Sequence, residues 1–487
     1  MSRPPTSQQI ISTRPNRDRK WWALLSVGLS FTMFTLDTSI VNIALPTLTK
    51  AFQVHLATAQ WVVISYLIVL TALTLSAARL GDLLGRQRLF QLGVILFTIS
   101  SLLCGIAPTI EWLIAFRVLE GLGAVFIAGL GMAIVTELFA SSPQRGLALS
   151  LAGMTLSVGA ILGPTVGGLL ITLGDWRAIF LINIPIGIIA TLLFVWSVPS
   201  TRVERSQTPH FDVLGAALLA GVMVSFSFGM STGQQQGFGN VIALSLLAIA
   251  LIGLGLFLRI EAHVRQPMLD LFLFRNPVLS LNLLSLAVVY VPLSARLAIY
   301  PFFLELALKY PTSQVGLIMI TMSLTNAIIA PLSGRLVDKV GTRFLIPTGL
   351  ALLTVGCLLA STFNAQLTPQ GYILRDLVMG VGFALWRSPN SVAVMSNAPA
   401  DKLGIVSGLL NESSMIGQTI GTPLAFALFS LLSLNYAKLP ADTLIATLPP
   451  DALIFAMHWT FLVMAMLLGA MTLANLLNLK SSNKLLH

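Results

Sequence analysis

Charged residues are scarce in this sequence. They make up only 9% of its 487 residues, whereas soluble domains carry about 25%. Hydrophobic residues account for 56% of the chain, and the mean hydropathy is +0.88. These values exclude an ordinary soluble protein, because the hydrophobic core of a soluble protein does not require so many apolar residues.

Residues that bind metals or catalyse reactions are also few. The two cysteines, Cys104 and Cys357, lie inside apolar stretches, which argues against a disulfide framework and a cysteine metal site. The five histidines are dispersed. The sequence has no His-x-x-His cluster, no Asp-x-Asp pair and no phosphate-binding glycine loop. We therefore expect a protein that is not an enzyme and that holds neither a metal nor a cofactor.

Long hydrophobic runs dominate the chain. Each of fourteen runs is near or above the ~20 residues that cross a bilayer as a helix. They lie at 22–45, 57–78, 89–109, 112–139, 146–173, 178–198, 212–231, 241–258, 277–305, 313–334, 344–362, 371–396, 404–434 and 454–478. The strands of a membrane β-barrel would instead be short segments in which apolar and polar residues alternate. The sequence predicts an all-α polytopic membrane protein with both termini on one side.

Basic residues are unevenly distributed between the two sides of these spans. On the side of the termini lie 20 of the 28 lysines and arginines, and the other side has only Lys50, Arg177, Lys309 and Lys438. Because basic loops tend to stay in the cytoplasm, we expect cytoplasmic termini and a bacterial plasma (inner) membrane. The net charge of +10 is then explained by the basic residues on the cytoplasmic side, which also contact the lipid bilayer. No nucleic-acid partner is expected.

An internal repeat divides the chain into two halves. The segment 79–86 recurs at 335–343 with an offset of 256, and the Gly121/Gly123 pair recurs 259 residues later. The predicted organisation is a tail (1–21), an N-terminal six-helix bundle (22–198), a linker with two extra membrane helices (199–275), a C-terminal six-helix bundle (276–479) and a tail (480–487). Repeats of this kind place a substrate site at the midplane, between halves that rock against each other.

Five segments resemble motifs of the major facilitator superfamily, in particular its fourteen-span drug:proton antiporter branch. The loop at 78–90 resembles the family signature, although Ala78 replaces its first glycine, and the copy from Gly334 is closer to it. The segments 36–46 and 176–185 are similar to motifs of the branch. A glycine stripe resembles the motif associated with antiporters and comprises Gly159, Gly163, Pro164, Gly167 and Gly168. The resemblance covers nearly the whole chain and implies alternating access and export.

The residues of these motifs have physical roles of their own. The glycines form a stripe without side chains at helical spacing, which lets another helix approach closely, and Pro164 bends the span. The two signature loops are short, and their charged residues are Asp82, Arg86, Asp338 and Arg343. We expect Glu137 to pair with Arg86, so that such pairs close the cytoplasmic side in one state. The alternative is a static surface pair.

Charges inside the spans are the strongest candidates for function, because each costs about 2.5–3.5 kcal/mol or more at a helix centre. Asp37 lies two-thirds along the first span and is the leading candidate for proton coupling or cation binding. Arg117 and Glu120 are three residues apart, hence on one helix face. The family pattern here is Arg-x-x-Gln-Gly, so Glu120 adds an acid where the family usually has an amide. The alternative for Glu120 is that it only neutralises Arg117.

The second half has its own intramembrane charges. Adding the repeat offset to the number of Asp37 leads to within a few residues of Arg296, so the two residues occupy nearly equivalent positions in the two halves. They could therefore pair across the halves in one state. Arg387 could receive an anionic group of a substrate or pair with Glu412, which lies deep in the span 404–434.

Two further places lie close to the ends of spans. Glu305 stands where the branch often has glutamine and could be solvated. Arg375 and Asp376 are expected to form a local solvated pair.

The favoured function is secondary active export by alternating access, with proton-coupled antiport of lipophilic or cationic drug-like compounds. We expect a monomer whose partners are a small lipophilic substrate, protons and the bilayer, and whose energy source is the proton gradient. The runner-up is export of an endogenous lipid-like or anionic metabolite recognised by Arg296 and Arg387. A membrane-bound transferase is the more distant alternative.

Overall fold

A computed structural model describes residues 17–140, 142–198, 213–264, 271–399, 402–441 and 443–484. Within these ranges the regular structure is entirely helical. Thirteen helical segments are long and apolar enough to cross a membrane. The fourteenth expected span is α14 (Pro369–Ser396), which is 28 residues long but carries three charged residues, Arg375, Asp376 and Arg387. The predicted all-α polytopic fold is confirmed.

The N-terminal half begins earlier than expected, because its first helix starts at Arg17 and takes in the end of the predicted tail. Residues 1–16 of that tail lie outside the described residues. The helices of this half are α1 (Arg17–Phe52), α2 (Leu56–Ala59), α3 (Trp61–Leu84), α4 (Arg86–Gly105), α5 (Ile110–Leu138), α6 (Arg145–Leu173), α7 (Ala178–Leu181) and α8 (Asn183–Ser197). α7 and α8 together make one span.

The C-terminal half repeats this arrangement. Its elements are η1 (Leu271–Arg275), α11 (Pro277–Phe302), the π-helical turn η2 (Phe303–Ala307), α12 (Thr312–Val340), α13 (Thr342–Ser361), α14, α15 (Leu403–Ala437), η4 (Ile445–Thr447) and α16 (Pro450–Lys484). The last helix therefore continues into the predicted tail, of which residues 485–487 lie outside the described part.

Single glycines separate the helices at the two copies of the signature motif. Gly85 lies between α3 and α4 with a φ of 98°, and Gly341 lies between α12 and α13 with a φ of 82°. Glycine adopts such positive φ values at little cost, unlike other residues. The expected loops are therefore one-residue turns, and the charged motif residues belong to the helix ends beside them.

The two inserted helices, α9 (Val213–Gln236) and α10 (Val241–Glu261), form a hairpin. α9 packs against α3 of one half and α15 of the other, so the hairpin covers a seam between the halves. An apolar cluster fills this contact and includes Ile64, Ile68, Leu219, Val222, Met223 and Phe257. Trp61 also donates a hydrogen bond from Nε1 to Ser231 Oγ at 3.3 Å, which ties the hairpin to the N-terminal half.

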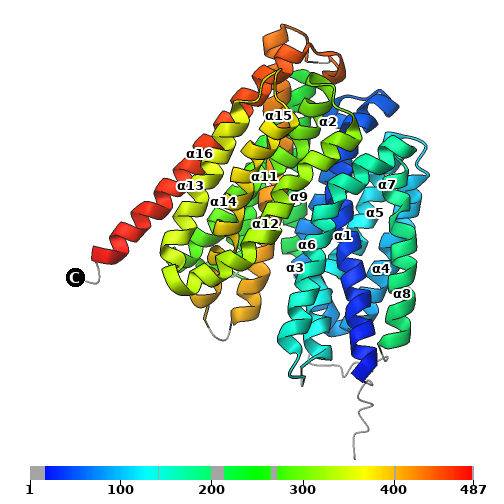
Figure 1. Cartoon of the computed structure of the whole chain (residues 1–487), viewed down its shortest axis with the longest axis vertical. Helices are drawn as coiled ribbons and strands as arrows, with labels where there is room; N and C mark the ends of the chain where they lie inside the picture. Colours follow the sequence, from blue (N-terminus) through cyan, green and yellow to red (C-terminus); the bar gives the residue numbers. More distant parts are fainter. Residues whose placement is uncertain are drawn as a thin grey trace, which may run out of the picture.

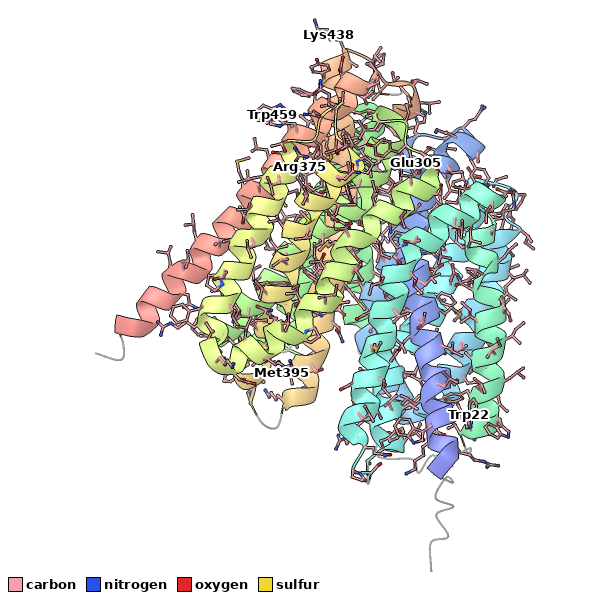
Figure 2. All side chains as sticks on the ribbon, in the orientation of Figure 1. Trp22, Glu305, Arg375, Met395, Lys438 and Trp459 are labelled. Atoms are coloured by element: carbon pink, nitrogen blue, oxygen red, sulfur yellow. The ribbon has the colours of Figure 1, made fainter. Side chains whose placement is uncertain are left out.

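The two halves form lobes that touch at one end of the molecule and diverge at the other (Figure 1). We call the end where α1 begins and α16 ends the tail end, and the opposite end, which carries Lys438, the loop end (Figure 2). Toward the loop end α6 and α12 are in close contact, since a Cβ added to Gly168 would lie 2.5 Å from the Thr312 carbonyl oxygen. At the tail end, Trp22 and Met395 lie on separate lobes (Figure 2).

Candidate functional site: buried charges beside a central cavity

The glycine stripe of α6 brings α1 into position. A Cβ added to Gly159 would collide with Thr35 and with the backbone of Thr32, and one added to Gly163 would collide with Ser39. Side chains at these positions would push α1 away, so the glycines fix the distance between α1 and α6. α1 is thereby held so that Asp37, within the same stretch of helix, points into the N-terminal half.

Asp37, Arg117 and Glu120 form one buried cluster, which we call the acidic triad. Arg117 Nη1 lies 2.7 Å from Asp37 Oδ2 and 2.6 Å from Glu120 Oε2. The exposed fraction of each of the three side chains is at most 1%. A single guanidinium nitrogen therefore binds both carboxylates, one from α1 and one from its own helix α5.

Neutral groups add further hydrogen bonds to the triad. Arg117 Nε donates to the Val62 carbonyl oxygen at 3.0 Å, and the guanidinium lies over the Tyr66 ring, with 4.2 Å from Cζ to the centroid. The Ser101 hydroxyl donates to Glu120 Oε1. Asn183 Nδ2 donates to Asp37 Oδ1 at 3.3 Å. Polar groups of the protein thus surround the triad with hydrogen bonds. Its charges are not balanced, because it contains two acids and one base.

The C-terminal half contains a matching pair with the charges exchanged. Arg296 binds Asp376 through two hydrogen bonds, Nε to Oδ1 at 2.6 Å and Nη2 to Oδ2 at 2.7 Å. The same offset of 259 residues takes Asp37 to Arg296 and Arg117 to Asp376. Arg296 also donates to the Met319 carbonyl oxygen at 3.1 Å. This pair is balanced, whereas the triad has two acids for one base.

One interpretation of the sequence is corrected by this pair, and a second concerns another state. Asp376 is 2% exposed, so it does not form a solvated pair with Arg375, which instead donates to the Gly371 carbonyl oxygen. Arg296 does not pair with Asp37 in this structure, because each residue binds its partner within its own half. The equal offsets were available in the sequence, but the neighbouring Arg375 offered a simpler partner for Asp376.

A cavity of about 130 Å³ lies between the halves, which we call the central cavity. The N-terminal half lines it with Thr38, Asn42, Val63, Tyr66, Leu67 and Arg117, and the C-terminal half with Tyr290, Leu293, Ser294, Leu297, Gln418 and Thr422. An engineered cavity of about 150 Å³ holds benzene, so this space admits about one aromatic ring. Arg117 belongs to both the cavity wall and the triad, and it is the one formally charged residue among the described lining.

Glu412, Arg387 and Glu305 lie outside both clusters. Glu412 on α15 is 3% exposed, and neither of its carboxylate oxygens has a hydrogen-bond partner among the residues described. Arg387 Nη1 is likewise buried without a partner, and its guanidinium lies 5.7 Å from the ring centroid of Tyr290. The considered pair of Arg387 with Glu412 is therefore absent. Glu305 is 7% exposed in the turn η2, near the loop end (Figure 2).

The signature residues lie at the tail end. Arg86 pairs with Glu137 as expected, but both residues belong to the N-terminal half, so this pair does not bridge the lobes. Asp338 is exposed at the end of α12, and Arg343 is half-exposed at the start of α13. The side chain of Asp82 lies outside what the structure describes. In the described part of the chain no cluster of three His, Cys, Asp or Glu residues is arranged to hold a metal ion.

The fold and the cavity define a class of protein: polytopic membrane carriers built from two six-helix halves around a central cavity. The family model of the Major Facilitator Superfamily matches residues 27–422 and 282–485, and the chain belongs to this transporter family.

Three known proteins illustrate the similarity. Multidrug resistance protein Stp of Mycobacterium tuberculosis is 34% identical over 398 residues, which cover 82% of this chain and 74% of that protein. Riboflavin transporter RibZ of Clostridioides difficile is 30% identical over 422 residues, with coverages of 86% and 90%. The solved structure of a bacterial homolog to the human lysosomal transporter Spinster, inward-facing and unoccupied, has a TM-score of 0.69 at 15% identity and covers 96% of this chain and 98% of its own. That last likeness concerns the fold alone.

Proposed function

We propose that this transporter is a proton-coupled exporter, which carries lipophilic small molecules out of a bacterial cell across the plasma membrane, with both termini in the cytoplasm. One observation carries the proposal: the acidic triad is buried, has two carboxyl groups for one guanidinium, and shares Arg117 with the central cavity. The proton gradient would be its energy source, and no cofactor is needed.

The charge imbalance supports a role in proton binding. With both acids ionised the triad carries one excess negative charge in a site closed to water, and uncompensated buried charge is costly. One bound proton removes the excess and leaves a balanced Arg–carboxylate pair. Glu120 is the better proton carrier of the two acids, because the Ser101 hydroxyl can hydrogen-bond its carboxyl group in either protonation state.

The arrangement of the lobes supports alternating access. The contact of α6 with α12 closes the loop end, while the lobes diverge at the tail end. If the tail end is cytoplasmic, this is the state that loads cargo from the cell. The signature residues Arg86 and Glu137 would then stiffen the N-terminal lobe as it rocks, since they link α4 to α5 within it.

A second candidate is export of one endogenous metabolite with an anionic group. The unpaired Nη1 of Arg387 beside the cavity residue Tyr290 favours it. A riboflavin transporter among the relatives supports transport of a single metabolite, although riboflavin itself is uncharged. The multidrug relative supports the broader substrate range. Export of a cationic dye and of an aromatic carboxylate dye by the same preparation distinguishes the two.

The test is transport in proteoliposomes under an imposed pH gradient. We expect uptake or release of a cationic dye to follow the gradient and to stop when an ionophore collapses it. Asp37→Asn keeps the shape of the side chain and removes its charge, so it should abolish the response to the gradient while the protein still folds. Gradient-driven transport at the parental rate by Asp37→Asn would exclude Asp37 from coupling and leave Glu120 and Glu412 as the candidates.

A further inference from the structure

Asn183 places two hydrogen-bond donors between the acids of the triad. Its Nδ2 atom lies 3.3 Å from Asp37 Oδ1 and 3.3 Å from Ser101 Oγ. An amide nitrogen has two hydrogens, and each of these contacts takes one of them. The Ser101 hydroxyl accepts from Asn183 and donates its own hydrogen to Glu120 Oε1. Asn183 and Ser101 therefore link the two carboxyl oxygens that Arg117 does not bind.

Close packing of two helices brings Asn183 to this place. It is the first residue of α8 and is fully buried. A Cβ added to Gly187, one turn further along α8, would collide with Thr98 of α4, which precedes Ser101 by three residues. A glycine at such a contact lets two helices approach closely. The glycine of α8 thus holds Asn183 beside Ser101.

The amide of Asn183 is turned so that it donates. Its Oδ1 atom is buried and has no hydrogen-bond partner among the residues described, and a buried acceptor without a donor is unfavourable. Turning the amide over would bring this oxygen to Asp37 Oδ1, where two acceptors would repel each other. The negative charge of Asp37 therefore sets the orientation, although the amide oxygen remains unsatisfied.

This neutral chain of donors favours the ionised acids. A hydrogen bond to an ionised group is about twice as strong as one between neutral groups. The hydrogens of Asn183 and Ser101 that face Asp37 and Glu120 therefore stabilise two carboxylates more than they stabilise a triad that holds a proton. The chain opposes proton uptake without contributing any charge of its own.

The titratable groups around Glu120 do not belong to this chain. They come from four helices and are Asp37 on α1, Tyr66 on α3, Cys104 on α4 and Arg117 on α5. The helices α7 and α8 contain no titratable residue, and α6 has only Arg145, at its first position. A change at Asn183 or Ser101 therefore leaves the number of charges unchanged and alters only the hydrogen bonds.

We propose that Asn183 is a positioning residue, which acts through Ser101 to set the pH at which the triad takes up its proton. This inference rests on the proposed function in taking the triad as the proton site. A carrier must release its proton as well as bind it, and the donors of Asn183 and Ser101 keep the triad from holding the proton too tightly. Without these donors the triad keeps its proton up to a higher pH.

Infrared difference spectroscopy of the purified protein in lipid nanodiscs tests the inference without transport. The band of protonated carboxylic acid is followed from acid to alkaline pH, and the part of it that Glu120→Gln or Asp37→Asn removes belongs to the triad. Asn183→Leu keeps the branched shape of the side chain but has no donor. We expect it to raise the midpoint of the triad band by about one pH unit, a tenfold change that one hydrogen bond can produce. An unchanged midpoint would overturn the proposal.

Ser101 supplies a second pair of variants, which keeps the test valid if Asn183→Leu does not fold. Ser101→Ala removes the donor to Glu120 and should also raise the midpoint. Ser101→Thr keeps the hydroxyl and should have the parental midpoint. A parental midpoint in Ser101→Ala would contradict the role of the chain.

Asn475→Leu is the matched control. Asn475 is a buried asparagine of α16 whose amide donates to the Met471 carbonyl oxygen of its own helix, at 3.0 Å. The same substitution there should leave the midpoint unchanged. A shift as large as that of Asn183→Leu would show a general effect of lost polar groups and would reject the positioning role.

The outcomes separate this inference from the proposed function. A triad band that shifts as expected, in a protein without gradient-driven transport, would keep the inference and reject only the exporter. A triad band that does not shift, in a protein with such transport, would reject the inference alone. A parent protein without a triad band at any pH would reject both.

Discussion

Replacing Glu120 by glutamine tests whether the excess acid of the triad couples transport to protons. The change keeps the size of the side chain and an oxygen that accepts from Arg117, and it restores the amide that the family pattern has at this position. Arg117 keeps its 2.7 Å contact with Asp37, so one base remains for one acid. The variant is therefore balanced in charge and has lost only the group that we expect to carry the proton.

The expected change in stability is small because two effects oppose each other. A hydrogen bond to a charged group contributes about 1.5–3 kcal/mol, against about 0.5–1.5 kcal/mol for a neutral one, so weakening this bond costs about 1 kcal/mol. Two like charges at about 4–5 Å repel by about 3–4 kcal/mol at an effective dielectric constant of 20, and the amide removes any such repulsion. We expect the free energy of unfolding to fall by no more than about 1 kcal/mol and to rise by up to about 3 kcal/mol if both acids are ionised in the parent. Arg117→Gln, which leaves two unpaired acids, should lose at least about 3–5 kcal/mol.

The assay compares thermal unfolding and two modes of transport on one preparation. Glu120→Gln should lose transport driven by a pH gradient but retain exchange of labelled for unlabelled substrate, which needs no net proton movement. Glu111→Gln is the control, since it makes the same change on an exposed residue of the same helix. A Glu120→Gln variant that follows the pH gradient like the parent would refute the reasoning. A loss of more than about 3 kcal/mol would assign Glu120 to structure.

Three further predictions concern the rest of the chain. Asp376→Asn should destabilise the protein by about 3–5 kcal/mol, because it leaves a buried arginine unpaired, and the exchanged pair Arg296→Asp with Asp376→Arg should recover at least half of that loss in thermal unfolding. Glu412→Gln should leave the melting temperature unchanged, since its carboxylate oxygens have no partner to lose, and any effect should appear in gradient-driven transport alone; a drop in melting temperature would reveal a structural role. Gly163→Ala should cost about 1–3 kcal/mol by overpacking against α1, whereas Gly146→Ala, which meets nothing within 4 Å, should not, and equal melting temperatures for the two variants would contradict the packing role.

The membrane spans could be predicted from the sequence because burial in lipid imposes a long apolar helix whatever its neighbours are. The ends of the helices were harder to predict. The polar residues around Gly85 led us to predict a loop at 78–90. The structure has helix throughout this segment except for the turn at Gly85. Hydropathy indicates which part of a helix can lie in the bilayer. It says little about the part of a helix that extends beyond the bilayer.

The triad was only partly predictable for a different physical reason. Arg117 and Glu120 share a helix face by their spacing, so their contact follows from local geometry. Asp37 joins them only because α1 packs close to its neighbours, and Ser101 and Asn183 come from two more helices. Contacts between helices depend on packing angles that a single sequence does not specify. The charge of each residue was visible in the sequence, whereas the number of acids per base was not.

Equivalent positions in the two halves carry different arrangements of charge. In the C-terminal half Arg296 and Asp376 satisfy each other through two parallel bonds, and a balanced bidentate pair of this kind is costly to break. In the N-terminal half the single Nη1 of Arg117 serves two carboxylates, so gain or loss of one proton changes the charge of the cluster without breaking the helix contact. The repeat therefore gives one lobe a pair with equal numbers of acids and bases, and the other lobe a cluster with one excess acid that shares Arg117 with the central cavity. In the proton-coupled cycle that we propose, a proton bound in the N-terminal half would change the charge beside the cavity, whereas the pair in the C-terminal half would stay unchanged. A ligand shifts an equilibrium only by its differential affinity for the two states, so this asymmetry would let a proton bias the cycle.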